Sequence, residues 1–178
     1  AACVRAHRRH AHARADADSG NGNFPRDKFR QPRGDRFQHE AEASCLFEQE
    51  RVFGRTWQLV GHAGDVGESG QYFTADVGGE SIVVLRDGAT LRGFHNICLH
   101  RAGPVASGCG TRQTLQCKYH GWTYRLDGSL LRTPGMEHAR HFTADEMHLV
   151  PVQVDTWGPL VFANLDLKAP PLGHFLED

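Results

Sequence analysis

Residues 95–124 read HNICLHRAGPVASGCGTRQTLQCKYHGWTY, and this stretch decides how the rest of the chain is interpreted. It contains two short pairs of metal-binding residue types, Cys98-x-His100 and Cys117-x-x-His120. Glycines follow both pairs, and glycine permits the tight backbone turns that let a loop wrap around a bound group. The pattern therefore predicts a metal centre that is approached from two sides by two separate loops.

Three interpretations of these four residues compete. Buried cysteines and core histidines could fall here by chance, although two matched pairs in a glycine-rich frame argue against it. A structural zinc ion is the second, because two Cys and two His complete a tetrahedral Zn²⁺ site. Zinc-finger pairs usually keep Cys with Cys and His with His, however, whereas both pairs here are mixed. The third is a 2Fe–2S cluster with two Cys on one iron and two His on the other, and we favour it.

The sequence around the motif resembles the Rieske domain of ring-hydroxylating and related non-heme iron oxygenases, roughly from Arg36 to the end of the chain. The matching segments are WQLVGH at 57–62, FHNIC at 94–98, HRAGP at 100–104, CKYHGWTY at 117–124, LDG at 126–128 and WGPLVFANLD at 157–166. The resemblance implies that the cluster ligands are Cys98, His100, Cys117 and His120. It also implies that two cluster-binding loops present them, with the His-bearing iron nearer the surface than the Cys-bearing iron.

Apolar periodicity predicts an all-β domain with a helix before it. Leu46, Phe53 and Trp57 fall on one face of a 3.6-residue period, so residues 39–56 are expected to be helical. From Gln58 onward the period becomes two, which is typical of strands. The expected strands are Gln71–Val77, Ser81–Arg86, Leu91–His95, Trp122–Leu126, Leu130–Arg132, Leu149–Val154 and Leu160–Asn164. With the resemblance, the expected fold is a Rieske-type antiparallel β sandwich with two cluster-binding loops and an N-terminal helix.

Composition and pattern divide the chain into four segments. Residues 1–23 are rich in Ala, Arg and His and lack apolar periodicity, so we expect a disordered or non-native tail. Residues 24–57 are the helical lead-in, and residues 58–167 are the Rieske 2Fe–2S domain. Residues 168–178 contain KAPPLG and are expected to be a linker toward a catalytic domain that this chain lacks.

The resemblance implies one-electron transfer as the electron-accepting domain of an oxygenase. Whole enzymes of this kind hold mononuclear Fe(II) in a C-terminal catalytic domain, with the motif D-x-x-H-x4-H, which does not occur here. We therefore expect no catalytic residues in this chain, and mononuclear iron only in the missing domain. The alternative is a free-standing Rieske-type ferredoxin. The helical lead-in and the WGPLVFANLD segment argue against it, because such ferredoxins resemble only the cluster core.

The resemblance also implies the partners. The electron donor would be an NAD(P)H-dependent reductase or a ferredoxin, and the acceptor the catalytic domain of the same or a neighbouring subunit. A full-length protein could be a homo-oligomer. The substrate, and the choice between monooxygenase and dioxygenase, do not follow from this sequence, since specificity would lie in the missing domain.

The expected reduction potential is at the low end of the Rieske range of about −150 to +300 mV. Respiratory-chain Rieske proteins carry a second Cys in each loop, joined as a disulfide, and neither loop here has one in that place. Trp122 also stands where that branch usually has a Ser that donates a hydrogen bond to sulfur. Fewer donors leave more negative charge on the reduced cluster, which disfavours reduction.

Other candidate residues are weaker. A ligand-like cluster at helical spacing, for which we expect solvated charge, comprises His138, His141, Asp145 and His148. His95 and His100 have the spacing of the two histidines in the mononuclear iron motif, but position 92 is Arg rather than Asp, so we reject that site. The cysteines outside the motif, which we expect to be dispensable, are Cys3, Cys45 and Cys109.

Bulk properties exclude two classes of partner. The net charge is −1, from 20 basic and 21 acidic residues, which argues against nucleic acid and anionic membranes. No apolar run approaches the roughly 20 residues of a membrane helix. No apolar stretch follows the basic start, as a secretory signal would require. We therefore expect a cytoplasmic protein.

Overall fold

The computed structural model describes residues 44–45, 47–136, 139 and 142–176, and every structural statement below concerns that part of the chain. Its strands are β1 (Gln58–His62), β2 (Gln71–Val77), β3 (Glu80–Asp87), β4 (Thr90–His95), β5 (Cys109–Thr111), β6 (Leu115–Gln116), β7 (Thr123–Tyr124), β8 (Leu130–Arg132), β9 (Pro151–Trp157) and β10 (Leu160–Asn164). Its short helical turns are η1 (Gln49–Phe53), η2 (Ala63–Val66), η3 (Ala144–Glu146) and α2 (Leu172–Leu176). No helix in this part is long and apolar enough to cross a membrane.

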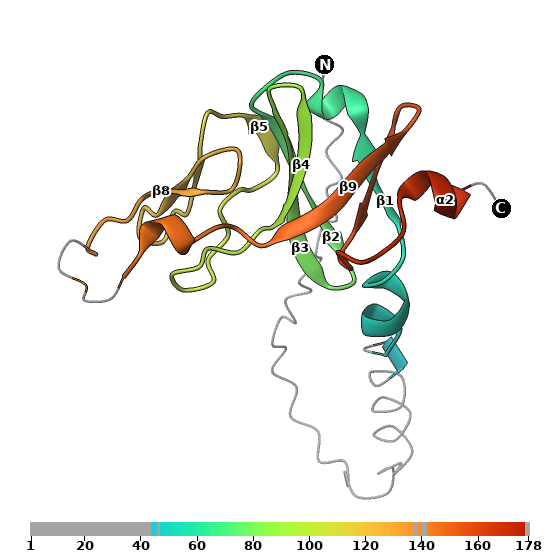
Figure 1. The fold of residues 1–178 in the computed structure, drawn as a ribbon, viewed down its shortest axis with the longest axis horizontal. Coiled ribbons are helices and arrows are strands. Elements are labelled where there is room, and N and C mark those ends of the chain that lie inside the picture. Colours follow the sequence, from blue (N-terminus) through green and yellow to red (C-terminus); the bar gives the residue numbers. More distant parts are fainter. Residues whose placement is uncertain (1–43, 46, 137–138, 140–141, 177–178) are drawn as a thin grey trace, which may run out of the picture.

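The strands form two antiparallel sheets. The larger has the order β1-β10-β9-β4-β3-β2-β5 and the smaller the order β6-β7-β8. Strands β2, β3 and β4 pair with their sequence neighbours through turns at Gly78-Gly79 and Asp87-Gly88, dipeptides that are typical of tight β-hairpins. The smaller sheet and its loops extend from one side of the larger sheet, as Figure 1 shows near the label β8. The predicted all-β antiparallel class is confirmed.

Strand β3 lies between two hydrophobic cores. Residues 82–85, Ile-Val-Val-Leu, are all fully buried. Side chains alternate across a strand, so Ile82 and Val84 face one core while Val83 and Leu85 face the other. A continuous apolar run is typical of a strand that is buried on both faces. The core that contains Val83 and Leu85 also contains both cysteines of the motif, so the central strand supports the two loops.

The structure differs from the expected elements mainly where strands are very short. Strands β5 and β6 were not predicted, because three- and two-residue strands inside a glycine-rich segment show no apolar alternation. Residues 44–45 and 47–48 are helical, and Gln49–Phe53 form a π-turn; the rest of the predicted helix lies outside the described residues. Within the segment expected as a linker, α2 packs by Leu172, which is only 1% exposed.

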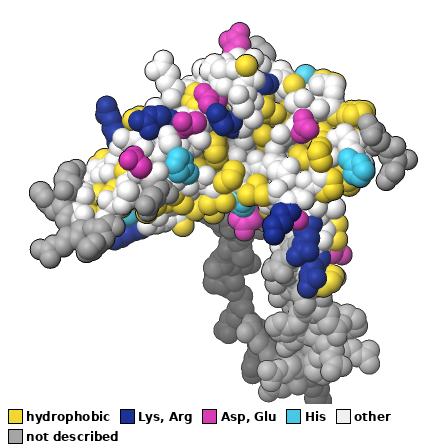
Figure 2. Space-filling view, viewed as in Figure 1, with side chains coloured by type: hydrophobic (Ala, Val, Ile, Leu, Met, Phe, Trp, Pro, Cys, Tyr) yellow, Lys and Arg dark blue, Asp and Glu magenta, His cyan; other side chains and the backbone are white. Residues whose placement is uncertain are grey.

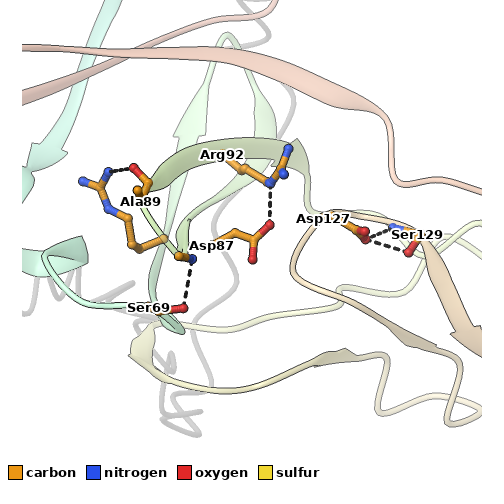
Figure 3. A network of polar contacts seen from close by, with 8 residues as sticks. Ser69, Asp87, Ala89, Arg92, Asp127 and Ser129 are labelled. Atoms are coloured by element: carbon orange, nitrogen blue, oxygen red, sulfur yellow. Dashed lines mark hydrogen bonds and ion pairs between the residues drawn. The ribbon is translucent and has the colours of Figure 1, made fainter.

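Side-chain hydrogen bonds of Asp87 and Asp127 hold the two Asp-Gly turns, as the close-up in Figure 3 shows. Arg92 Nε donates to Asp87 Oδ2 at 2.8 Å across the β3–β4 hairpin. Asp127 Oδ1 accepts from the backbone N–H and the hydroxyl of Ser129, at 2.9 and 2.6 Å. These hydrogen bonds hold the pKa of the Asp127 carboxyl below its usual value. Figure 2 shows acidic and basic side chains interspersed on the same face, which suits a net charge near zero.

The two Asp-Gly turns give a matched test of the packing. Gly88 and Gly128 both have positive φ, 59° and 88°. A β-carbon at Gly88 would meet nothing within 4 Å, whereas one at Gly128 would lie 2.6 Å from the ring of Phe94. We predict that Gly88→Ala costs about 1–2 kcal/mol of unfolding free energy, from backbone strain alone. Gly128→Ala should cost about 3–5 kcal/mol, because overpacking adds to the strain.

Urea unfolding of both variants, followed by far-ultraviolet circular dichroism, measures this difference. Equal losses in the two variants would show that Phe94 can move aside and that the contact does not constrain the turn.

Candidate functional site

The four motif residues lie on two loops that face each other. The first loop (residues 96–108) joins β4 to β5, and the second loop (residues 117–122) joins β6 to β7. Each loop turns tightly at its cysteine. The Cys98 N–H donates to the Gly103 carbonyl at 2.8 Å and the Ala102 N–H to the Cys98 carbonyl at 2.9 Å. In the second loop, the Cys117 N–H donates to the Trp122 carbonyl at 2.9 Å, and the Gly121 N–H donates to the Cys117 carbonyl at 3.0 Å.

The turns require unusual backbone conformations. Gly121 has a φ of 75°, which suits glycine, and Ala102 has a φ of 53°, the one positive value at a non-glycine residue among those described. A non-glycine residue in this region is uncommon and often marks a functional site. The first loop therefore stores strain where it passes between Cys98 and Gly103.

The cysteines lie deep and the histidines lie toward the surface. Cys98 and Cys117 are each 2% exposed, whereas His100 is half-buried and His120 is exposed. The two imidazole rings lie edge to face, with centroids 4.6 Å apart. The structure thus brings together all four residues that the motif predicted, and it places the thiols inward and the imidazoles outward, as the resemblance implied.

The two loops meet at Gly103. A β-carbon added there would lie 3.0 Å from Cys117 Sγ and 3.5 Å from the β-carbon of Tyr119. Since real β-carbons rarely approach other atoms so closely, any side chain at position 103 would require one loop to shift by a few tenths of an ångström, and glycine requires no such shift. The closeness of the two loops is therefore set by this residue.

A buried nitrogen without a hydrogen-bond partner supports a metal centre between the two loops. Nδ1 of His100 is buried and makes no hydrogen bond, a condition that costs free energy unless another partner binds it. Two thiols and two imidazoles, with an open nitrogen on one of them, form a donor set that fits a 2Fe–2S cluster. Among the described residues, no three Cys, His, Asp or Glu side chains surround a single ion position. A two-iron cluster needs only two protein ligands on each iron.

Trp122 holds the imidazole of His100 in place. The two rings stack with centroids 4.9 Å apart and an angle of 8° between their planes. The ring of Phe142 packs edge-on against the indole of Trp122, with the ring centroids 5.7 Å apart. Burial and the nearby charges of His120 and Arg101 lower the pKa of His100, so the neutral, ligating form of the ring is favoured.

Tyr124 lies next to the first cysteine. Its hydroxyl oxygen is 3.3 Å from Cys98 Sγ and accepts a hydrogen bond from the Leu99 N–H at 3.0 Å. Burial first, and then the contact with Cys98, raise the pKa of Tyr124, so the phenol stays protonated. A protonated phenol whose oxygen already accepts from Leu99 has its own hydrogen left to donate, and the sulfur of Cys98 is the acceptor in reach.

Asn96 fixes the course of the first loop. Its side-chain oxygen accepts from the N–H groups of Val105 and Ala106, at 3.0 and 2.9 Å. Its side-chain nitrogen donates to the Ala106 carbonyl at 3.0 Å and to Ser81 Oγ at 3.2 Å. Asn96 is 5% exposed, so these groups are satisfied away from water. The amide thus closes the loop onto its own start and ties it to β3.

The weaker candidates do not form a second site in the described residues. His138 and His141 lie outside them, while Asp145 and His148 are exposed. His95 is the last residue of β4, and its Nδ1 lies 3.9 Å from a carboxylate oxygen of Glu80. Sequence reasoning missed Asn96 and Tyr124, and it gave Gly103 a role in turning the first loop but did not predict its contact with Cys117. The available signal was their place inside the segments FHNIC, HRAGP and CKYHGWTY, where no metal-ligand chemistry singles them out.

Comparisons with known proteins agree on one family. The family described as the Rieske [2Fe-2S] domain matches residues 56–151. Chloroplastic choline monooxygenase of Beta vulgaris is 41% identical over 120 residues, which are 67% of this chain and 27% of that protein. The carnitine monooxygenase oxygenase subunit of Escherichia coli K12 is 36% identical over 124 residues, or 68% of this chain and 33% of that protein.

Solved structures give the same result. The apo form of the quaternary ammonium Rieske monooxygenase CntA has a TM-score of 0.69 and 34% identity, covering 73% of this chain and 38% of that chain. A naphthalene 1,2-dioxygenase variant bound to phenanthrene has a TM-score of 0.71 and 27% identity, covering 76% of this chain and 32% of that chain. The chain therefore spans about a third of the length of the proteins it resembles.

We predict that Asn96 controls the order of the first loop. In Asn96→Ala, the N–H groups of Val105 and Ala106 lose their acceptor and should exchange faster with solvent. The unfolding free energy should fall by about 2–4 kcal/mol, because buried backbone groups are left unsatisfied. Hydrogen exchange followed by mass spectrometry or NMR measures the first effect.

Asn164→Ala is the matched control. Asn164 is also buried, and its amide bonds to Arg55 and Asp166 rather than to the first loop. If the two variants left Val105 and Ala106 equally protected, Asn96 would have no special role in this loop.

Proposed function

We propose, from the premise that this chain belongs to the Rieske [2Fe-2S] domain family, that Cys98, His100, Cys117 and His120 hold its cluster. Domains of this family carry a 2Fe–2S cluster and transfer electrons in Rieske oxygenases. The cluster supplies one-electron redox chemistry when bound. The observation that carries the ligand assignment is the buried, unpartnered Nδ1 of His100 on a loop that meets the second cysteine.

The residues around the thiols and imidazoles have separable tasks in this proposal. The deep position of Cys98 and Cys117 excludes water from the sulfurs, and the Tyr124 hydroxyl donates to Cys98. Trp122 orients His100, and the exposed ring of His120 gives the electron a short way out. Acceptance and release of an electron can then occur without rearrangement of the core.

The whole protein's activity is also a proposal. We place this chain as the electron-accepting part of a Rieske non-heme iron oxygenase, with mononuclear iron in a catalytic domain outside it. Every relative reported above is an oxygenase, so the comparisons give the free-standing ferredoxin no support. The higher identities are to enzymes named for choline, carnitine and quaternary ammonium compounds, and we propose a substrate of that class.

Partners and location follow the same reasoning. One of the similar structures is described in terms of inter-subunit electron transfer, which supports a catalytic domain in a neighbouring subunit as the acceptor here. An NAD(P)H-dependent reductase or a ferredoxin is the proposed donor. A cytoplasmic location remains a proposal, since the plant relatives are named as chloroplastic.

The ligand assignment predicts the metal content. Purified and reconstituted protein should contain about two irons and about two labile sulfides per chain. Cys98→Ser and His100→Ala should lose the cluster and much of the order of both loops, because ligand binding contributes to folding free energy. Cys45→Ser, at an exposed thiol away from the site, is the control and should keep the visible spectrum. Metal analysis that found one zinc and no sulfide would contradict the assignment.

The hydrogen bond from Tyr124 predicts a change in potential. Tyr124→Phe removes a donor to Cys98 Sγ, which leaves more negative charge on the reduced state. If the bond contributes about 1 kcal/mol, the potential should fall by roughly 40 mV for a one-electron couple. Protein-film voltammetry measures it. Tyr72→Phe is the control, because that buried hydroxyl donates to the Ser107 carbonyl and not to sulfur. Equal shifts in both variants would assign the effect to general loosening of the core.

A further inference from the structure

A hollow lies beside the two loops, and none of the four motif residues lines it. Its volume is about 340 Å³. It is lined by Gly103, Pro104, Val105, Ala106, Ser107, Arg112, Gln116, Lys118 and Tyr119. Apolar groups form most of the wall, and the exposed ring of Tyr119, 70% accessible, stands at its edge. Both loops contribute to the hollow, so a molecule seated there would touch both.

The charged residues of the hollow are all basic. Arg112 and Lys118 line it, and no Asp or Glu does. Neither cation takes part in any of the ion pairs between described residues. Arg112 is held by the ring of Tyr72, with its guanidinium carbon 5.4 Å from the ring centroid. An apolar hollow with two cations in its lining and no carboxylate fits a partner surface that carries acidic residues around an apolar side chain.

The hollow also approaches the sulfur of Cys117. Gly103 lines it, and a β-carbon on Gly103 would lie 3.0 Å from Cys117 Sγ. The backbone of Gly103 therefore both lines the hollow and packs against the thiol of Cys117. His120, by contrast, is exposed and does not line the hollow, and its ring centroid lies 4.6 Å from that of Tyr119. The hollow thus leads to the thiol side of the centre, and the imidazole side stays open to solvent.

We infer that this hollow is the docking site of an acidic electron-donor protein, which delivers its electron on the thiol side of the centre. The inference rests on the proposed function and adds the surface and the chemistry of the donor. One electron leaves the reduced donor and one is gained by the oxidised domain, and no bond forms or breaks. An apolar side chain of the donor fills the hollow, and its carboxylates face Arg112 and Lys118. Entry and exit then use two different faces of the same centre.

The test compares two reductants of the full 178-residue chain in stopped-flow absorbance measurements. One is reduced plant-type 2Fe–2S ferredoxin, used as a probe because it is an acidic one-electron carrier. The other is dithionite, which needs no docking surface and reports whether the cluster is intact. The measured quantity is the ratio of the two rate constants. In Lys118→Glu and in Arg112→Gln, this ratio should fall about tenfold at low ionic strength, since steering by charge is lost. The difference should shrink as salt is added.

Lys168→Glu is the matched control. Lys168 is exposed and lies near the end of the domain, outside the hollow, so its ratio should equal that of the unchanged chain. A further variant, Tyr119→Ala, removes the apolar ring at the edge of the hollow without changing the charge of the chain. Its ratio should fall at high salt as well as at low salt.

The outcomes separate the two proposals. Equal ratios in Lys118→Glu and Lys168→Glu would overturn the docking site and leave the electron-transfer function standing. So would failure of the ferredoxin to reduce a chain that dithionite reduces readily. Self-association of the unchanged chain that Tyr119→Ala abolishes in sedimentation velocity would assign the hollow to a second copy of the chain instead. If dithionite reduced nothing and no iron–sulfur spectrum were present, the proposed function itself would fail.

Discussion

The approach of Gly103 to the sulfur of Cys117 is the contact on which the site depends. It brings the first loop against the second, and a residue without a β-carbon allows this distance without a shift of either loop. The surrounding structure maintains this contact from both sides. Asn96 fixes the far end of the first loop through its bonds to Val105 and Ala106, and the core around strand β3 supports both cysteines from below. The fold therefore supplies a rigid base, and two loops of irregular backbone supply the chemistry.

The sequence predicted the parts of this arrangement that depend on local pattern. The hairpins at Gly78-Gly79 and Asp87-Gly88 follow from turn chemistry that needs only two residues, and the strand expected at Ser81–Arg86 follows from its β-branched and apolar composition. The Cys and His pairs also predict a metal centre, because few other roles need those residue types at that spacing. Strands β5 and β6 could not be predicted in this way. They exist because neighbouring strands pair with them, and their own residues carry little strand preference.

The residues that support the site could not be predicted from sequence patterns, because their contacts depend on tertiary structure. Asn96 is a common turn residue, and nothing in its neighbours shows that its amide meets backbone groups nine and ten positions later. Tyr124 lies in strand β7 and Cys98 on the first loop, so their contact exists only after β7 has paired with β6 and β8. The basic hollow is also a tertiary feature, because residues 103–107 and 116–119 come together only when the loops meet. The local sequence therefore identifies the four motif residues, whereas tertiary packing determines which residues surround them.

The depth of the two residue types has a consequence for the direction of electron flow. Thiolates carry negative charge and accept hydrogen bonds, so they gain from burial only where donors such as Tyr124 are provided. Neutral imidazoles tolerate the surface and can contact a partner there. Burying the two cysteines and placing the two histidines toward the surface therefore gives the proposed centre two unlike faces. An exposed imidazole such as that of His120 can meet an acceptor directly, whereas both thiols are only 2% exposed. The residue that packs against Cys117 Sγ, Gly103, also lines the hollow that holds the basic residues, so it takes part both in the contact between the loops and in the wall of the hollow.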